Sequence, residues 1–521
     1  MKFRMRILCV VLAILTVVSL SACAAKMADS EMNDADLGDG MTGNAGRPNA
    51  PMEAPTEASP ESSVENQKPD GDNGEVIFVE NSFISTATEN ISTFSADVDT
   101  ASYTYFRKLV NSGYNLTELI GSGTSFRTEE FINYFDYNVN QPADGELFGV
   151  DSGIIPCPWS EDSLLFRLTL QAQTADDSKG NNLVFLIDVS GSMSSSDKLP
   201  LLKKTFSYLV GNLDADDKVS IVTYSGKEAV VLDGCEGSKG EMIMQTINGL
   251  VANGSTNGEA GLTEAYRLAE KHYIEDGNNR IIMASDGDLN VGISSAEELE
   301  NYVSEKRRQG VYLSVLGFGT GNYRDANMEA LADNGNGVYY YIDGESEAER
   351  VLGTDILGTL YTVAEDVKLQ LTFDKDYISE YRLIGYENRL LNKEDFEDDT
   401  KDAGEVGASH QVTVCYELKL CEGVDVKAEA DWLTLAVRYK NPGETISRPN
   451  DYAIGSGSYT EEADEDMTFL YCVLDTCMIL HNSKYIGETT IDDVLEILNT
   501  LDLSECPERE EFRELIDKLV Q

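Results

Sequence analysis

Histidine, tryptophan and basic residues are scarce in this chain of 521 residues. It contains 3 histidines, 2 tryptophans, and 40 lysines and arginines against 92 aspartates and glutamates, which gives a formal net charge of −52. The 3 histidines are scattered without ligand spacing, which argues against a zinc site. A surface of this charge repels nucleic acid phosphates and anionic lipid headgroups, so we expect neither as a partner. It should instead attract divalent cations and basic ligands.

The familiar sequence motifs of hydrolases and nucleotide-binding enzymes are also absent. There is no Gly-x-Ser-x-Gly elbow, no His-Glu-x-x-His and no Gly-x-x-x-x-Gly-Lys phosphate loop. The 9 cysteines show no disulfide framework. Cys415 and Cys421 lie too far apart on one predicted strand to form a bridge, and Cys472 and Cys477 do not face each other on a predicted helix. Whether long-range bridges form stays open.

The first residues have the features of a targeting signal. Three basic residues precede an apolar run over 7–20, which is too short for a typical membrane-spanning helix. The run ends in Leu20-Ser-Ala-Cys23, which resembles the bacterial lipobox. This resemblance implies a signal peptide over 1–22, cleavage before Cys23 and a lipid on its thiol. We therefore expect an extracytoplasmic protein in the bacterial cell envelope, attached to the membrane by the lipid anchor only.

The segment that follows the lipid site is predicted to be a disordered, acidic tether over 23–76. It has no aromatic residue and is rich in Pro, Gly, Ser, Asn and Ala. Such a composition buries too little apolar surface to offset the entropy cost of ordering the chain. About fifty residues of this kind span roughly 40 Å on average.

The most informative stretch is Leu183-Val-Phe-Leu-Ile-Asp188, followed by a Gly/Ser-rich turn. Five successive apolar residues predict a strand buried on both faces, as in the centre of a parallel sheet. Asp188, Ser190 and Ser192 then occupy alternate positions, and on an extended chain their side chains point the same way. Carboxylate and hydroxyl oxygens are hard ligands that suit Mg²⁺, Ca²⁺ or Mn²⁺. The alternative is that these residues only cap the helix that follows.

Two later segments support the metal interpretation. Residues 254–258, Gly-Ser-Thr-Asn-Gly, place a hydroxyl in a tight loop before a helical pattern, and residues 280–287 form an apolar run that ends in an acid and a turn. Together the three segments resemble the von Willebrand factor type A domain and its metal-ion-dependent adhesion site. The resemblance implies that the metal is bound by the hydroxyls of Ser190, Ser192 and Thr256, with Asp188 and Asp286 nearby, often acting through water.

Strand and helix patterns alternate over 177–358, which we interpret as the type A domain. This alternation predicts right-handed crossovers and a doubly wound, mainly parallel α/β sheet with helices on both faces. Ligands of such sheets bind at the carboxyl ends of the strands. The three candidate metal segments all follow strands or lie in loops that can meet at that edge.

The flanking regions are interpreted as separate modules. Residues 77–176 form an N-terminal α+β module, in which Asp97 and Asp99 do not fit a calcium loop and are interpreted as turn and cap residues. Residues 359–458 show period-two alternation, typical of half-buried antiparallel strands, and 459–521 show three helical patterns. Segments 381–390 and 402–405 resemble the characteristic segment of one bacterial subfamily of type A proteins.

The expected function follows from the donor set. Neutral hydroxyls are weak donors, so the ion keeps an exchangeable water position that a partner's carboxylate can take. In the type A family ligands are captured in this way. The resemblance therefore implies a non-enzymatic adhesion protein that uses Mg²⁺, or Mn²⁺ or Ca²⁺, and binds an extracytoplasmic protein through a Glu or Asp. The ligand itself and the oligomeric state stay open.

Two alternatives remain. A Mg²⁺-dependent hydrolase would use Asp188 as its nucleophile, but such enzymes usually carry a second acid two residues later, where this chain has Ser190. They also need a nearby cationic group, and the sequence shows none. The other alternative is a scaffold whose metal site is vestigial or purely structural.

Overall fold

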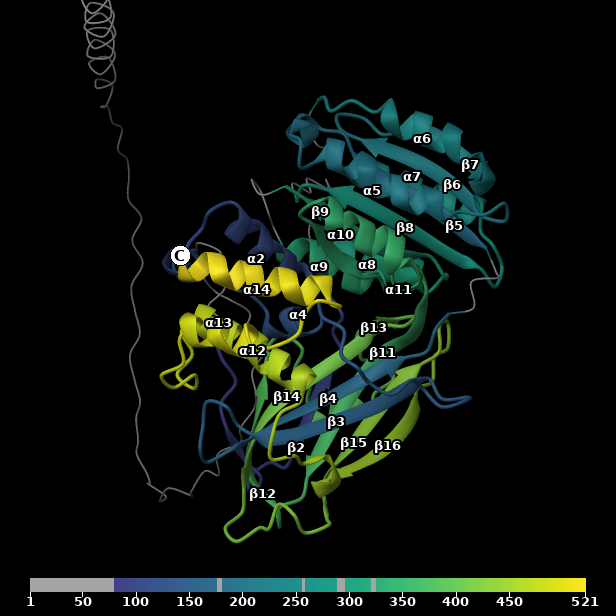
Figure 1. The fold of residues 1–521 in the computed structure, drawn as a ribbon. Coiled ribbons are helices and arrows are strands. Elements are labelled where there is room, and N and C mark those ends of the chain that lie inside the picture. The colour runs from purple at the N-terminus through teal and green to yellow at the C-terminus, as the bar shows by residue number, and fades with distance from the viewer. Residues whose placement is uncertain (1–78, 176–179, 255–257, 288–295, 320–324) are drawn as a thin grey trace, which may run out of the picture. The chain divides into compact units, whose positions relative to one another are not determined.

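A six-stranded sheet forms the centre of the α/β unit (Figure 1). In the computed structural model, which describes residues 79–175, 180–254, 258–287, 296–319 and 325–521, its strand order is β10-β9-β8-β5-β6-β7. Neighbouring strands are parallel except at the edge, where β7 is antiparallel to β6. The strands are β5 (Asn181–Asp188), β6 (Lys218–Tyr224), β7 (Ala229–Glu236), β8 (Asn278–Ser285), β9 (Tyr312–Phe318) and β10 (Tyr339–Ile342).

Helices cover both faces of this sheet, as the alternating patterns predict. Along β5, Leu183, Phe185 and Ile187 belong to the core that contains α5. Val184 and Leu186 belong to the core that contains α7. The five-residue apolar run is therefore buried on both faces. The helices are α5 (Leu199–Gly211), α6 (Gly240–Asn248), α7 (Glu259–Lys271), α8 (Ala296–Arg307), α9 (Asp325–Asn334), α10 (Glu345–Glu349) and α11 (Ile356–Leu360), with the π-helical turn η3 (Arg350–Thr354).

Two further sheets each combine strands from before and after the α/β unit. One has the order β1-β12-β14-β4-β3, and the other has the order β13-β11-β15-β16 with β2 also paired to β11. All of their strand pairs are antiparallel. The sequence patterns did not predict this mixing. The strands are β1 (Ile84–Ser85), β2 (Ile91–Ser95), β3 (Phe148–Pro156), β4 (Leu164–Ala172), β11 (Thr362–Phe373), β12 (Ile378–Ile384), β13 (Gly404–Gly407), β14 (Gln411–Leu420), β15 (Asp431–Lys440) and β16 (Arg448–Gly455).

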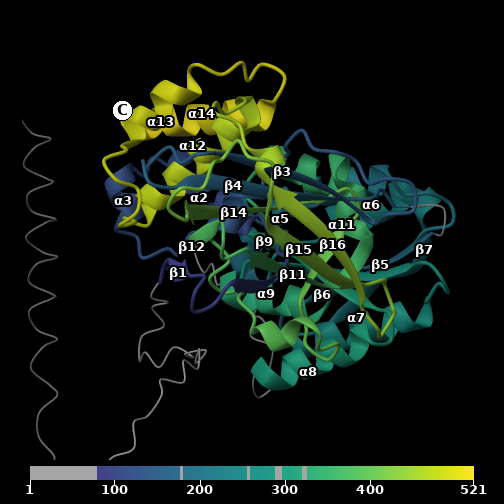
Figure 2. The same cartoon turned by 90° about the horizontal axis from the view of Figure 1, so that it is seen from below.

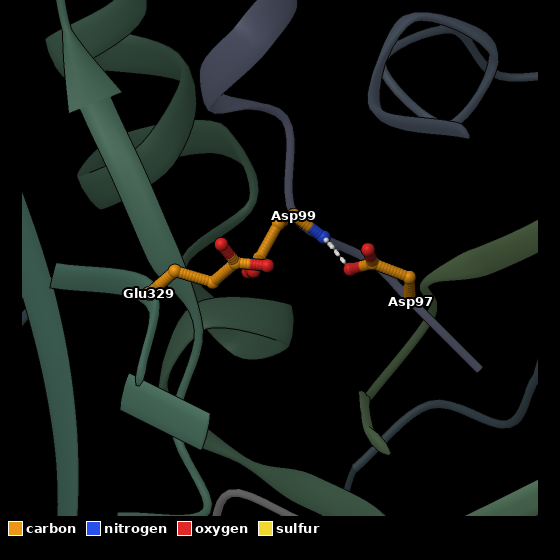
Figure 3. Close-up of side chains that lie close together, drawn as sticks. All are labelled: Asp97, Asp99 and Glu329. Atoms are coloured by element: carbon orange, nitrogen blue, oxygen red, sulfur yellow. Dashed lines mark hydrogen bonds between the residues drawn. The ribbon is translucent and has the colours of Figure 1, made fainter. Parts of the chain in front are cut away.

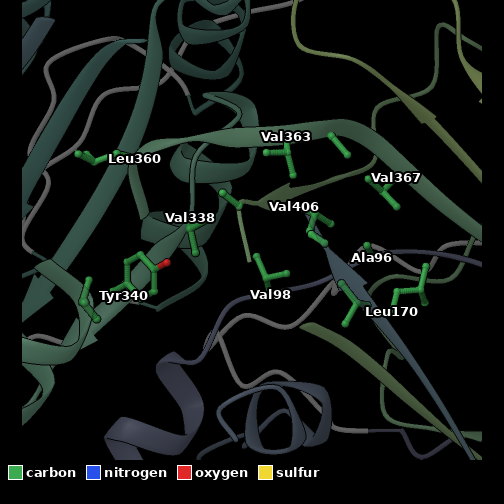
Figure 4. Packing of buried hydrophobic residues seen from close by; sticks show 14 of the residues in the cluster. Ala96, Val98, Leu170, Val338, Tyr340, Leu360, Val363, Val367 and Val406 are labelled. Carbon is green, nitrogen blue, oxygen red and sulfur yellow. The ribbon is translucent and has the colours of Figure 1, made fainter. Parts of the chain in front are cut away.

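The two antiparallel sheets share one hydrophobic core. Leu168 on β4, Leu369 on β11 and Leu435 on β15 belong to it and are fully buried. The same core continues into the α/β unit, where it includes Val338 and Tyr340, which Figure 4 shows together with Val98 and Val363. Burial of this apolar surface joins the described parts of the chain after residue 78 into one compact unit.

A helical layer covers the outer face of the sheet that contains β4 and β14 (Figure 2). Its core includes Leu165 of β4 and Cys415 of β14. The three helices predicted after residue 459 are found there as α12, α13 and α14. No helix in the described part of the chain is long and apolar enough to cross a membrane. The helices are α2 (Ala101–Asn111), α3 (Leu116–Ile120), α4 (Thr128–Ile132), α12 (Glu465–Leu480), α13 (Ile491–Leu498) and α14 (Pro507–Val520).

Candidate functional site: the carboxyl edge of the central sheet

The candidate site begins where β5 ends. Asp188 is the last residue of β5 and is fully buried. β5 pairs with β8 on one side, with Ile187 opposite Ala284, and Asp286 follows β8 directly. Because parallel strands end at the same edge of a sheet, the two acids that the sequence predicts as site residues lie at neighbouring strand ends.

The two serines after Asp188 are brought together by a turn. The backbone N–H of Ser190 donates to Asp188 Oδ1 at 2.8 Å, and the hydroxyl oxygens of Ser190 and Ser192 are 2.9 Å apart. The prediction that they meet on an extended chain was wrong in its geometry. The backbone is extended only as far as Ser190, and a 3₁₀ turn, η1 (Gly191–Ser194), then folds Ser192 back toward it. Ser190 is buried and Ser192 is exposed, so the pair opens toward solvent.

Thr256, the third predicted hydroxyl ligand, lies outside the described residues. The chain that leads to it is held against the serine turn by two backbone hydrogen bonds. Gly191 N donates to Gly254 O at 3.0 Å, and Asn253 N donates to Val189 O at 2.7 Å. Only a short segment therefore separates Thr256 from a residue in direct contact with the turn.

Asp286 has a basic partner that the sequence analysis missed. Lys198, which precedes α5, donates from Nζ to Asp286 Oδ2 at 2.7 Å. Both side chains are buried. The two residues are 88 positions apart, and no local pattern predicts such a pair. The sequence shows only a lysine between the serine turn and the apolar start of α5.

The described donors fit a hard divalent cation. Asp188, Ser190, Ser192 and Asp286 offer only carboxylate and hydroxyl oxygens, which Mg²⁺, Mn²⁺ and Ca²⁺ accept. Two carboxylates match the charge of such an ion, although Lys198 already compensates one of them. These residues would hold the ion at the open edge of the sheet, where it would offer a Lewis-acidic position to an external oxygen.

Asp97, Asp99 and Glu329 form a second group of acids, shown in Figure 3. One oxygen from each lies within 4.8 Å of the others, and all three side chains are buried. Arg389 lies among them, with Nε 3.0 Å from Asp97 Oδ2 and Nη2 2.9 Å from Glu329 Oε1. Arg127 also pairs with Glu329. The group is therefore an internal ion-pair network, because the guanidinium groups already supply its positive charge.

The interpretation of Asp97 and Asp99 as turn and cap residues was half right. Asp97 Oδ1 accepts from Asp99 N at 3.0 Å, which is a local turn. Asp99 caps no helix: the N-cap of α2 is Thr100, without a side-chain cap, and Asp99 Oδ1 accepts instead from Tyr339 N of β10. Burial raises the pKa of both carboxyls above the usual value, while Arg389 opposes that rise.

A third acidic group, Asp366, Asp402 and Glu405, is also close to cationic side chains. Arg307 pairs with Asp402 at 2.6 Å, and Lys440 pairs with Asp366. Burial raises the pKa of Glu405 well above its usual value, and the two neighbouring acids add to this. We therefore interpret this group as a second structural ion-pair network and not as a metal site.

The described cysteines form no disulfide bond in the structure, and all seven are free thiols. Burial raises the pKa of the Cys157 and Cys415 thiols to about 12, which disfavours the reactive thiolate.

Family models match three consecutive segments of the chain. Residues 182–353 match the von Willebrand factor type A domain. Residues 76–167 match a model described as von Willebrand factor, and residues 358–521 match the C-terminal region of the uncharacterized protein YfbK. The match over 182–353 contains the six strands of the central sheet, at whose edge the candidate site lies, except for the first residue of β5.

Individual relatives extend this picture. The uncharacterized protein YfbK of Escherichia coli (strain K12) is 37% identical over 440 residues, which cover 79% of this chain and 75% of that protein. Human inter-alpha-trypsin inhibitor heavy chain H3 is 25% identical over 268 residues, 48% of this chain and 30% of its own. A solved von Willebrand factor type A structure from Catenulispora acidiphila matches with a TM-score of 0.41 and 14% identity, covering 73% of this chain and 91% of that one. Because YfbK is 37% identical over most of both chains and residues 182–353 match the type A domain, the chain belongs to the bacterial family of von Willebrand factor type A domain proteins that includes YfbK.

Proposed function

We propose that this protein is a lipid-anchored protein of the bacterial cell envelope that binds a partner protein through a divalent metal ion. The observation that carries the proposal is the convergence at the end of β5, where the Ser190 and Ser192 hydroxyls are 2.9 Å apart beside the buried Asp188 carboxylate. Hydroxyl donors leave the ion electron-poor, and an aspartate or glutamate of the partner completes its shell. Mg²⁺ is the ion we expect first, with Mn²⁺ or Ca²⁺ as substitutes.

The location is proposed from the first residues alone. The tetrapeptide that ends at Cys23 and the basic, then apolar segment before it support processing as a lipoprotein. Radiolabelled palmitate should enter the protein in a bacterial host, and Cys23→Ser should abolish both the label and membrane retention. Incorporation of label into the Cys23→Ser variant would contradict the anchor.

Metal binding is the first test of the site. We expect Asp188→Asn to weaken Mg²⁺ binding by about 100-fold and Ser192→Ala by about tenfold, because each removes one oxygen donor or its charge. Ser194→Ala, an exposed serine in the same turn, is the matched control and should leave the affinity unchanged. Isothermal titration calorimetry on the full chain measures all four proteins. Equal affinities in Asp188→Asn and the unchanged protein would refute the proposed site.

Partner capture then tests the function. An envelope extract passed over immobilised protein should yield a bound protein in Mg²⁺ that is released by EDTA and is absent with Asp188→Asn. Capture that survives both treatments would mean that the metal takes no part in recognition, and the scaffold alternative would replace adhesion.

One observation makes the hydrolase worth a direct assay. The sequence shows no cationic group next to Asp188, but in the structure Lys198 reaches Asp286 at the same edge of the sheet. Ser190 still stands where such enzymes usually carry their second acid. We expect no Mg²⁺-dependent turnover of p-nitrophenyl phosphate. Turnover that disappears in Ser190→Ala would establish the enzyme instead.

A further inference from the structure

Lys198 places a positive charge inside the predicted metal site. Its Nζ donates to Asp286 Oδ2 at 2.7 Å, and the Asp286 side chain is completely shielded from solvent. A charge-assisted hydrogen bond of this kind is short and strong where water is excluded. Asp286 is thus already compensated by a group belonging to the chain itself.

The ammonium group is held in place by packing. Lys198 is 8% exposed, and its backbone carbonyl accepts from Leu202 N in the first turn of α5. Its side chain runs against Gly319, where an added Cβ would lie 2.2 Å from Lys198 Cε. Gly319 O in turn accepts from the Tyr341 hydroxyl at 2.9 Å. The Lys198 side chain is therefore packed into the carboxyl edge of the central sheet, unlike a solvated surface lysine.

The charge count at the edge has a direct consequence. Asp188 and Asp286 together carry two negative charges, which one divalent ion would neutralise. Among the described residues, Lys198 makes the combined charge of the donors and the ion one unit more positive than it would be without the lysine. Because like charges repel and opposite charges attract, the buried lysine disfavours the cation and favours an incoming anion.

We propose that Lys198 sets the charge of the site, so that metal is held more weakly and a ligand carboxylate more strongly than by the oxygen donors alone. This inference rests on the proposed function and adds a residue that tunes it: Lys198 shifts the balance between metal binding and carboxylate binding at the same site. Loss of the lysine charge should strengthen metal binding and weaken carboxylate binding. Loss of a residue that only supports the fold would not change the two affinities in opposite directions.

The test compares Lys198→Met, which keeps the length and removes the charge, with Lys198→Arg, which keeps the charge. Electron paramagnetic resonance of free Mn²⁺ gives the metal affinity of the full chain. Loss of one like charge near a divalent ion should tighten Mn²⁺ binding by about tenfold in Lys198→Met. Lys198→Arg should bind Mn²⁺ within about threefold of the unchanged protein, since both cations repel it alike.

Acetate serves as the probe for the anion. It is titrated into each Mn²⁺-loaded protein, and the fall in water-proton relaxivity reports displacement of water from the ion. Acetate should bind at least about fivefold more weakly to loaded Lys198→Met than to the loaded unchanged protein. A structural role for the lysine would not move the two affinities in opposite directions.

The outcomes separate the role of Lys198 from the existence of the metal site. If Lys198→Met binds Mn²⁺ no more tightly, or acetate no more weakly, the role of Lys198 is refuted while the site stands. If the unchanged protein binds no Mn²⁺ at millimolar concentration, the proposed function itself fails. Should Lys198→Met unfold without metal, the same two titrations on Lys198→Gln, which retains a hydrogen-bond donor to Asp286, decide the question.

Discussion

Replacing Arg389 by methionine is expected to destabilise the protein by about 4 kcal/mol at pH 8, because removal of one partner from a buried ion pair leaves the other charges uncompensated. Arg389 pairs with Asp97 at 3.0 Å, and with Glu329 and Asp333 at 2.9 Å each. In the variant, the acids of Figure 3 lose the guanidinium that lies among them. Arg127 remains on Glu329 and offsets only part of the loss.

The pH dependence gives this prediction its sign. Burial raises the pKa of Asp97 and Asp99 in the folded protein. A carboxyl with a raised folded pKa binds more protons when folded than when unfolded, so its contribution to stability falls as the pH rises from the unfolded toward the folded pKa. Loss of Arg389 strengthens this effect. The loss in free energy of unfolding caused by Arg389→Met should therefore be clearly smaller at pH 5 than at pH 8.

Urea unfolding followed by circular dichroism at the two pH values measures the deficit. Arg448→Met is the matched control, because Arg448 pairs with Glu444 on the exposed surface and such pairs contribute about 0.5 kcal/mol or less. A deficit that is equal at pH 5 and pH 8, or no greater than that of the control, would contradict the role assigned to Arg389.

Asp475→Asn is expected to stabilise the protein by about 4 kcal/mol at pH 8. Asp475 lies in α12 and is 2% exposed, and its Oδ1 has no hydrogen-bond partner among the described residues. Burial, with a smaller contribution from Asp493, raises the pKa of the Asp475 carboxyl to about 7. Each pKa unit corresponds to about 1.4 kcal/mol, so the ionised carboxylate is costly above pH 7.

The sign again follows from proton linkage. Between pH 4 and pH 7 the folded protein keeps a proton on Asp475 that the unfolded chain has lost, and stability falls as pH rises through this range. The neutral amide of Asn does not titrate. The gain in free energy of unfolding from Asp475→Asn should therefore be near zero at pH 4, increase up to pH 7 and then stay constant.

Thermal unfolding of the variant across pH 4 to 9 tests this profile. Glu496→Gln removes a charge from the exposed surface of the neighbouring α13 and should change stability by less than about 0.5 kcal/mol throughout. A gain in Asp475→Asn that does not vary with pH would show that lost packing or helix propensity, rather than ionisation, explains it.

The residues that could be predicted from the sequence are those whose partners are local or whose periodicity is strong. The apolar run before Asp188 predicts a central strand because burial on both faces leaves no polar position within it. Period-two alternation likewise predicts β11, β14 and β15, and the helical patterns predict α12 to α14. The resemblance to the type A domain placed the acids and serines at one edge of the sheet.

What could not be predicted depends on partners far apart in the chain. Lys198 meets Asp286 across 88 residues, and Arg389 meets Asp97 across 292. A charged residue carries no local sign of which distant charge it will meet. The antiparallel strands show the same limit: alternation identifies a half-buried strand, but its neighbour is chosen by packing of the whole core.

The mixed sheets also constrain how the chain can mature. Strand β4 pairs with β14, and Thr169 of β4 lies opposite Thr413 of β14, 244 positions later in the chain. Strand β4 is therefore synthesised long before its partner exists. The α/β unit between them contains all six strands of its own sheet. Short loops close more readily than long ones. We therefore expect the α/β unit to fold first, while β4 still lacks its partner β14. The early strands therefore depend on delayed pairing, and the last third of the polypeptide completes the antiparallel sheets.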